Sequence, residues 1–148
     1  MAVDGRLNVV VGVSGGIAAY KACHLVRAFT ERGHSVRVVP TPSALNFVGA
    51  ATFEALSGNP VSTTVFDAVD EVRHVRVGQE ADLVVVAPAT ADLMARLAAG
   101  MADDLLTTLC LASQSRKVMA PAMNQAMWAH PATQRNATRL AEDGWRLL

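Results

Sequence analysis

Cysteine, aromatic residues and excess charge are all scarce in this 148-residue chain. The two cysteines, Cys23 and Cys110, lie far apart in apolar helical patterns. We therefore expect buried free thiols in a reducing compartment rather than the disulfide framework of a small secreted protein. The 13 basic and 13 acidic residues give a formal net charge of zero, so nothing in the charge balance points to a nucleic-acid partner.

Long apolar runs, signal-peptide features and metal-ligand spacings are also missing. No apolar run approaches the roughly 20 residues of a membrane span, and the N-terminus is short and polar. The 4 histidines lack partners in patterns such as H-E-x-x-H, so we expect no metal site. With 51% hydrophobic residues, the chain is expected to form one soluble, cytoplasmic domain without membrane or nucleic-acid partners.

Short apolar runs rich in β-branched residues predict strands buried on both faces of a sheet. The runs are Val9–Val13, Val36–Val39, Leu83–Ala87 and Lys117–Ala120, with further candidates at Val61–Phe66 and Trp145–Leu148. Helical patterns lie at Ala18–Arg32, Thr90–Ala99, Asp103–Ala112 and Ala132–Asp143, with Gly33, Gly100 and Gly144 as stops. Alternating strands and helices predict an α/β fold: a doubly wound, Rossmann-like parallel sheet with helices on both faces.

The residues that follow each predicted strand lie where open α/β sheets bind ligands. These segments are Ser14–Gly16, Thr41–Ser43, Pro88–Thr90 and Pro121–Asn124. The first turn lacks G-x-G-x-x-G, no acidic residue ends the second strand to hold an NAD ribose, and no P-loop is present. Neutral hydroxyls at these positions suit a phosphate monoester, although each could equally be a helix cap. Together they favour a mononucleotide site.

Several residues with catalytic potential also have plain structural interpretations. A lone histidine such as His74, after the acidic stretch Asp67–Glu71, is more often structural than catalytic on pattern alone. No G-x-S-x-G motif supports Ser-His-Asp hydrolysis. We interpret Asp103 and Asp104 as helix caps. The segment Met123–Trp128 offers an amide and a large apolar surface where ligands bind, although its methionines could equally fill the core.

Four motifs, in order, resemble those of the flavin-dependent cysteine decarboxylases. Pro121–Trp128 is similar to their P-x-M-N-x-x-M-W signature, Ala87–Asp92 to A-P-A-T-A-N, Gly100–Leu106 to G-x-A-D-D-L-L, and Gly12–Lys21 to their opening turn. The agreement runs from about Asn8 to Leu148. Within the family, the chain resembles in particular the N-terminal half of the bacterial bifunctional phosphopantothenoylcysteine decarboxylase/phosphopantothenate–cysteine ligases.

This resemblance implies an FMN-dependent, flavoprotein-like enzyme that oxidatively decarboxylates 4′-phosphopantothenoylcysteine to 4′-phosphopantetheine in coenzyme A biosynthesis. His74 matches the active-site histidine, which would take the thiol proton. Asn124 matches the residue that holds the substrate carboxylate, and Ala122, Met123 and Met127 would line the substrate pocket. FMN would contact Ser14, Gly15, Ser43, Phe47, Pro88, Ala89, Thr90 and Met123. We therefore expect the loops at the carboxyl rim of the sheet to hold FMN beside His74 and Asn124.

The resemblance also implies an assembly and shows two departures. The family forms homotrimers, often gathered into dodecamers, with FMN between subunits of a trimer. Asp92 stands where the family has Asn. The chain stops at Leu148, before the family's substrate-covering segment with its catalytic cysteine and before the ligase half. Neither Cys23 nor Cys110 matches that cysteine. We expect residues 1–148 to form a single domain that binds FMN and assembles, with the final reduction left open.

Three alternatives share part of this pattern. A peptidyl-cysteine decarboxylase would carry the same motifs. A flavin prenyltransferase shares the fold and a similar first turn, but the segment Pro121–Trp128 argues against it. A non-catalytic, flavin-binding regulatory subunit would need neither His74 nor Asn124.

Overall fold

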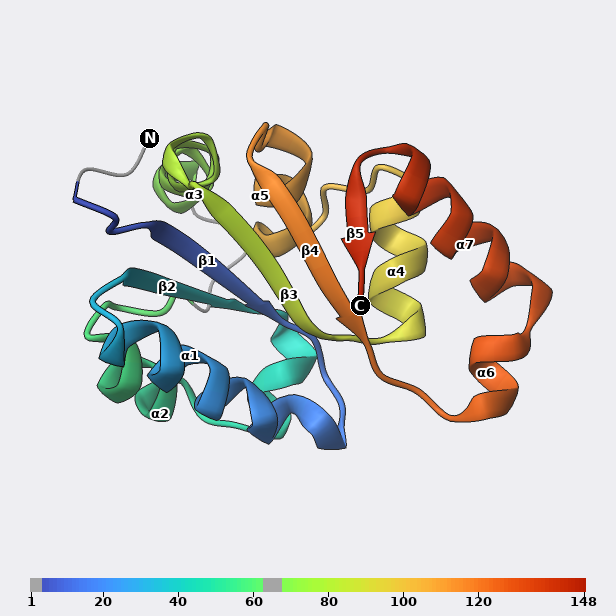
Figure 1. Ribbon diagram of the computed structural model, residues 1–148, viewed down its shortest axis with the longest axis horizontal. Coiled ribbons are helices and arrows are strands. Elements are labelled where there is room, and N and C mark those ends of the chain that lie inside the picture. The colour runs from blue at the N-terminus through green and yellow to red at the C-terminus, as the bar shows by residue number, and fades with distance from the viewer. Residues whose placement is uncertain (1–3, 63–67) are drawn as a thin grey trace.

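The computed structural model describes residues 4–62 and 68–148, which form one sheet with helices on both sides (Figure 1). The strands are β1 (Asn8–Val13), β2 (Ser35–Pro40), β3 (Leu83–Ala89), β4 (Arg116–Pro121) and β5 (Trp145–Leu147). All neighbouring pairs are parallel, and the strand order is β2-β1-β3-β4-β5. This order is that of a doubly wound sheet, so the predicted fold class is confirmed.

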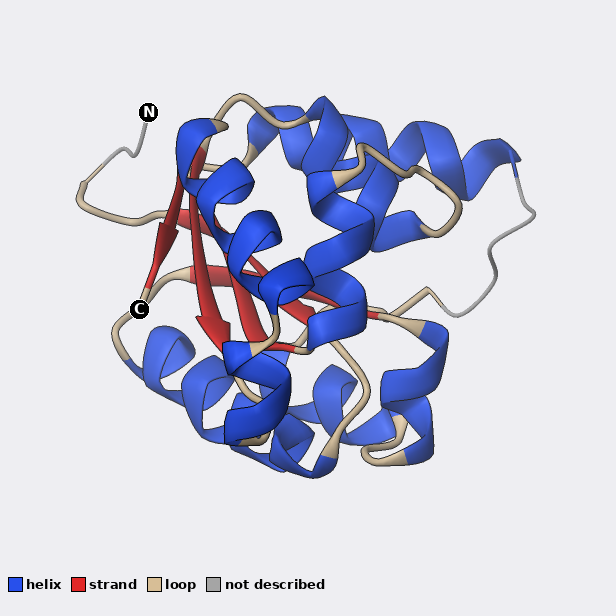
Figure 2. Ribbon diagram, turned by 90° about the vertical axis from the view of Figure 1, so that its right-hand side faces the viewer, coloured by secondary structure: helices blue, strands red, loops and turns tan. Residues whose placement is uncertain are grey.

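Helices cover both faces of the sheet (Figure 2). They are α1 (Lys21–Glu31), α2 (Ala50–Ser57), α3 (Ala68–Glu80), α4 (Ala91–Ala98), α5 (Leu105–Ala112), α6 (Gln125–Ala129) and α7 (Pro131–Glu142), with 3₁₀ helices η1 (Ile17–Tyr20) and η2 (Pro42–Asn46). Helices α1 and α2 cover one face, and α3, α4, α5 and α7 cover the other. Within the described residues, no helix is both long and apolar enough to cross a membrane.

Alternate residues of β1 contribute to two separate apolar cores. Val9 and Val11 pack with α1 and α2, whereas Val10 packs with the helices of the opposite face. Such a strand needs apolar residues at nearly every position, which is the pattern in the sequence. A Cβ atom at Gly12 would lie 2.6 Å from Leu106 Cδ1, so glycine allows α5 to approach the centre of the sheet.

Segments with a regular apolar pattern form the predicted strands and helices, and three further helices of the structure were not predicted. The helix predicted at Ala18–Arg32 begins as η1 before it continues as α1, and Gly33 follows with φ of 85°. The pattern does not predict α2, α3 or α6. Of the strand predicted at Val61–Phe66, the first two residues lie outside any strand, and residues 63–67 lie outside the described residues.

Helix α3 is missed because, among its residues 72–80, the side chains of which the structure describes, the two buried positions are not large apolar residues. His74 and Gly78 are buried there, whereas Val72 is exposed. A Cβ atom at Gly78 would lie 2.9 Å from the backbone oxygen of Leu109 on α5. The close approach of the two helices therefore depends on a glycine, which apolar periodicity does not register.

Candidate functional site

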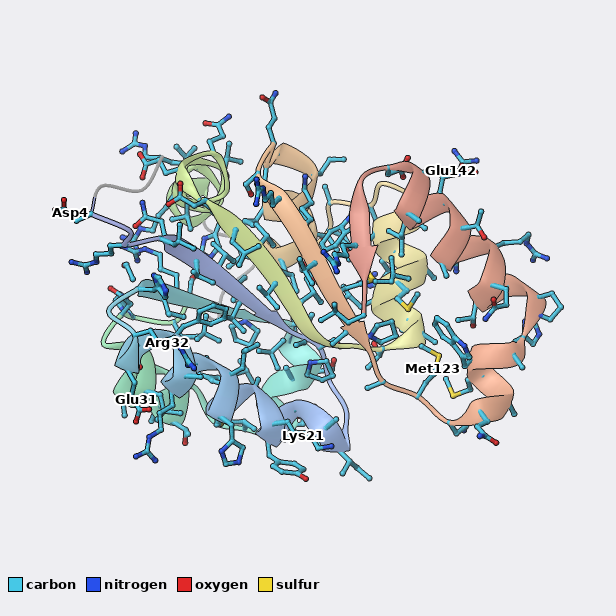
Figure 3. The ribbon with its side chains drawn as sticks, viewed as in Figure 1. Asp4, Lys21, Glu31, Arg32, Met123 and Glu142 are labelled. Carbon is cyan, nitrogen blue, oxygen red and sulfur yellow. The ribbon has the colours of Figure 1, made fainter. Side chains whose placement is uncertain are left out.

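The loops after the first four strands are joined by hydrogen bonds at the carboxyl rim of the sheet. The Thr41 N–H donates to the Val13 carbonyl oxygen at 2.8 Å, and the Ala122 N–H donates to the Ala89 carbonyl oxygen at 3.0 Å. Figure 3 shows Lys21 and Met123 at this end of the molecule. The predicted ligand-binding segments are thus neighbours in space, at the edge where doubly wound sheets bind ligands.

Ser14 joins the loop after β1 to the loop after β3. Its hydroxyl donates to the Pro88 carbonyl oxygen at 2.6 Å and accepts from the Thr90 N–H at 3.0 Å. The Ala87–Pro88 peptide bond is cis. Ser14 is only 2% exposed. A hydroxyl has one proton to donate, and in Ser14 this proton is used within the protein.

Gly15 lies against the start of η2. A Cβ atom at Gly15 would meet the Ser43 Oγ atom and would lie 2.8 Å from Ser43 Cβ. The Ser43 hydroxyl is 3.2 Å from the Thr41 Oγ1 atom, which in turn accepts from the Ala44 N–H. The absence of a side chain at Gly15 therefore brings backbone and hydroxyl groups together in a narrow cradle.

A cavity of about 370 Å³, which we call the hydroxyl cavity, opens beside this cradle. Its lining includes the hydroxyl residues Ser14, Thr41, Ser43 and Thr90. Thr90 is the N-cap of α4, because its Oγ1 atom accepts from the Leu93 N–H at 3.2 Å. The cap interpretation is correct for Thr90, and its hydroxyl proton is not donated within the described residues.

Charged residues also line the hydroxyl cavity. The Arg96 guanidinium donates to Asp103 Oδ2 from both terminal nitrogens, at 2.8 and 2.9 Å, and its Nε lies 3.5 Å from Asp92 Oδ2. Asp104 accepts from the Thr107 N–H at 2.8 Å and caps α5. The prediction of two caps is therefore confirmed for Asp104 and wrong for Asp103, which holds Arg96 instead.

A second cavity of about 410 Å³, the amide cavity, shares Thr90 with the first. Its walls include Lys21, Pro88, Ala122, Met123 and Asn124. Asn124 is the N-cap of α6, since its Oδ1 atom accepts from the Met127 N–H at 2.9 Å. This bond fixes the orientation of the amide. Its Nδ2 group makes no hydrogen bond with the described residues and remains available to an anionic ligand.

Large apolar side chains are exposed around the amide cavity. Ile17 is 84% exposed and lines the cavity with Tyr20, while Met127 and Trp128 are exposed on α6 just beyond Asn124. Apolar residues gathered on a surface in this way are typical of an interaction site. Met127 itself lines neither cavity in a single chain.

His74 does not join Asn124 within one chain, contrary to the expected arrangement. It is buried on α3 and lines a separate, small cavity with Arg37, Val39 and Ser62 at the edge strand β2. Asn124 follows β4. With neighbouring strands about 4.8 Å apart, the two strands are separated by three spacings, or about 14 Å. The two side chains therefore line different cavities of a single chain.

Three of the predicted FMN contacts, Gly15, Phe47 and Ala89, are not among the residues that line the two cavities. Phe47 is exposed after η2, and Ala89 is fully buried in the core, where its carbonyl accepts from the Ala122 N–H.

Cys23 and Cys110 are free, although Cys23 is only partly buried. Burial raises the pKa of Cys23 and raises that of Cys110 to about 12. Neither thiol lines the two cavities. Within the described residues, no cluster of His, Cys, Asp and Glu could hold a metal ion.

Comparison with protein families identifies the class to which this architecture belongs. The family model described as Flavoprotein matches residues 2–148. The chain belongs to the flavoprotein family. The predicted resemblance to flavin enzymes of this fold is thereby confirmed at the level of the family.

Curated relatives resemble the chain along nearly all of its length. It is 65% identical over 142 residues to the coenzyme A biosynthesis bifunctional protein CoaBC of Mycolicibacterium smegmatis, a match that covers 96% of this chain and 34% of that protein. The corresponding protein of Escherichia coli K12 is 49% identical over 146 residues, covering 97% of this chain and 36% of that protein. The chain thus spans about a third of the length of these relatives.

Solved structures of flavoproteins share the fold. The FMN-dependent cysteine decarboxylase TvaF from thioviridamide biosynthesis is 32% identical, with a TM-score of 0.91, covering 97% of this chain and 90% of that one. A PPC decarboxylase mutant complexed with pantothenoylaminoethenethiol is 31% identical, with a TM-score of 0.84, covering 97% of this chain and 81% of that one. The recognition of cysteine decarboxylase motifs in the sequence is therefore confirmed.

Sequence reasoning missed two features of the site. The Arg96–Asp103 pair links α4 to the loop before α5, and the seven-residue separation of its members is not a helical contact spacing. Lys21 brings a positive charge to the amide cavity from the start of α1. Its place in the opening-turn motif was the one available signal for it, because an exposed lysine is otherwise an ordinary surface residue.

Proposed function

We propose that this chain binds FMN and oxidatively decarboxylates 4′-phosphopantothenoylcysteine. The observation that carries the proposal is the fixed amide of Asn124, whose Nδ2 group remains available in a cavity that adjoins the hydroxyl-lined cradle. The coenzyme A biosynthesis proteins, at 65% identity, favour this substrate over a peptide. Both cysteines are free thiols, Cys23 partly buried and Cys110 buried, which fits the reducing cytoplasm.

The two cavities fit the parts of a flavin nucleotide. The phosphate needs hydrogen-bond donors without side-chain bulk, and Gly15, Ser43 and Thr90 provide such a surface. Pro88 and Met123 offer apolar walls for the ring in the amide cavity. When bound, FMN supplies a two-electron acceptor, which permits oxidation of a cysteine thiol to a thioaldehyde and so makes loss of the adjacent carboxylate feasible.

Asn124 would hold the substrate carboxylate through Nδ2. A neutral donor binds the carboxylate without the strong ion pair that would stabilise the ground state before CO₂ leaves. The α6 cap at Oδ1 restricts rotation of the amide, so the donor is in place before substrate arrives. His74 would accept the thiol proton on an imidazole nitrogen, a role suited to this side chain.

The site would form between subunits of a homotrimer, with His74 supplied by the neighbouring copy. Two features support this arrangement. His74 and Asn124 line separate cavities in one chain, and apolar side chains such as Ile17 and Trp128 are exposed beside the Asn124 cavity. Trimers could associate further into dodecamers. Light scattering should give a trimer or larger; a flavin-bound monomer would contradict the shared site.

The experiment that tests the proposal compares two substrates. The yellow, FMN-loaded protein is incubated with phosphopantothenoylcysteine or with a cysteine-ended peptide, and CO₂ is measured by mass spectrometry. We expect release from the first substrate. Release from the peptide alone would assign a peptidyl-cysteine decarboxylase, and a colourless protein that cannot be loaded with FMN would refute the flavin site.

The variant His74→Asn removes the proposed base and is compared with the wild type. His74→Asn should retain FMN, because Gly15, Ser43 and Thr90, the residues proposed to hold the phosphate, are unchanged, and should lose CO₂ release. Normal turnover by this variant would show that His74 is not the base.

A further inference from the structure

We propose that Ser14 is a positioning residue of the flavin site, and that Thr90 is the donor it positions. The inference rests on the proposed function and changes the expected role of Ser14. Instead of contacting the flavin nucleotide with its hydroxyl, Ser14 holds the backbone of the neighbouring loop in the conformation that presents Thr90.

The hydrogen bonds of Ser14 leave it no proton for a ligand. Its hydroxyl donates to the Pro88 carbonyl oxygen at 2.6 Å and accepts from the Thr90 N–H at 3.0 Å. The oxygens of a phosphate dianion only accept hydrogen bonds, so they require donors. The single hydroxyl proton of Ser14 is already used, and the residue is buried.

Thr90 has the capacity that Ser14 lacks. Its N–H is taken by Ser14, and its Oγ1 atom accepts from the Leu93 N–H at 3.2 Å, so one bond fixes its backbone and another its side chain. The proton on Oγ1 is not donated to any described residue. Because Thr90 lines both the hydroxyl cavity and the amide cavity, this donor lies where the two parts of a flavin nucleotide would meet.

Rotation of the Ser14 hydroxyl toward a ligand is the competing explanation. It would break the 2.6 Å bond to the Pro88 carbonyl oxygen, which would then keep only the 3.3 Å bond from the Ser14 backbone N–H, while the Ser14 oxygen would still accept from the Thr90 N–H. The two explanations differ in the flavin-free protein. Only a positioning residue controls the Thr90 loop before any ligand is present.

The test uses Ser14→Ala with Ser43→Ala as the matched control, since Ser43 is exposed and holds no neighbouring loop carbonyl. In flavin-free Ser14→Ala, hydrogen exchange of the Thr90 amide should accelerate about tenfold, because its acceptor is gone. FMN affinity should fall about tenfold, because Thr90 is no longer held in place as a donor. Ser43→Ala should leave Thr90 exchange unchanged and reduce the preference for FMN over riboflavin.

Unchanged Thr90 exchange in Ser14→Ala, with loss of the FMN preference, would overturn the inference and make Ser14 a phosphate contact. If the wild-type protein bound no flavin, the proposed function would fall, and this inference with it. Should Ser14→Ala fail to fold, Thr90→Val removes the proposed donor directly. Flavin affinity should then fall about tenfold, and unchanged affinity would overturn the assignment.

Discussion

Substitution of Gly15 by alanine should disrupt the cradle between the loop after β1 and η2. The new Cβ atom would lie 2.8 Å from Ser43 Cβ and 2.9 Å from the Ser43 carbonyl carbon. Real Cβ atoms essentially never approach closer than 3.0 Å. One of the obstructing atoms belongs to the backbone, so a side-chain rotation cannot relieve the overlap. The loop or η2 must move.

The cost of this movement sets the expected magnitude. Overpacking of a well-filled site destabilises a protein by about 1–3 kcal/mol. For a domain near 150 residues, each kcal/mol lowers Tm by about 2–4 °C, which gives a fall of about 2–12 °C. Separation of the hydroxyls around Gly15 should also weaken FMN binding by at least about tenfold, the equivalent of one lost hydrogen bond.

Gly16→Ala is the matched control. Its Cβ atom would lie 3.6 Å from Thr90 Cγ2, an ordinary contact, and Gly16 has φ of 179°, an extended conformation open to any residue. We expect a Tm close to wild type, with stability changed by less than about 0.5 kcal/mol. Thermal unfolding measures the Tm of both variants, and flavin fluorescence titration measures the FMN affinity of Gly15→Ala. Equal Tm values for Gly15→Ala and Gly16→Ala would refute the close approach of Gly15 and Ser43.

Three further predictions follow from the site and the core. Asn124→Asp retains the α6 cap but opposes the substrate carboxylate, so CO₂ release should fall about 100-fold with normal melting; undiminished release would contradict the assignment. Arg96→Gln loses the two bonds to Asp103, and the partly exposed pair should cost about 0.5–1 kcal/mol in urea unfolding; a gain in stability would contradict its role. Burial raises the pKa of Cys110 to about 12, above the 9.0 of an unperturbed thiol. The contribution of this buried neutral thiol to the free energy of unfolding is therefore complete below pH 9 and is lost as pH rises toward 12. The decline in unfolding free energy should be shallower in Cys110→Ala, and an identical pH profile would contradict this.

Sequence patterns predicted the sheet because strands that are buried on both faces are built almost entirely from apolar residues. Runs such as Val9–Val13 are buried on both faces, and the β-branched composition follows directly from that burial. Caps and stops were likewise local signals, as at Thr90 and Gly33. Helix α3 escaped prediction because its buried contacts are made by His74 and Gly78, residues whose role depends on where α5 lies.

The candidate site was predictable to the extent that it depends on strand ends. Parallel strands bring their carboxyl ends to one edge, so the sequence alone groups Gly15, Ser43, Thr90 and Asn124. Strand order decides the rest. It places β2 at the edge and β4 three positions away, which separates His74 from Asn124. No local pattern encodes that distance.

The most direct test of a flavin site shared between subunits mixes two inactive variants. His74→Asn and Asn124→Asp chains are unfolded, combined in equal amounts and refolded with FMN, and CO₂ release from phosphopantothenoylcysteine is compared with the wild type. If His74 of one subunit serves Asn124 of the next, random assembly restores about one quarter of the sites. Recovery near that fraction is the expected result. Failure of the refolded mixture to release CO₂, alongside an active wild-type control, would contradict the account.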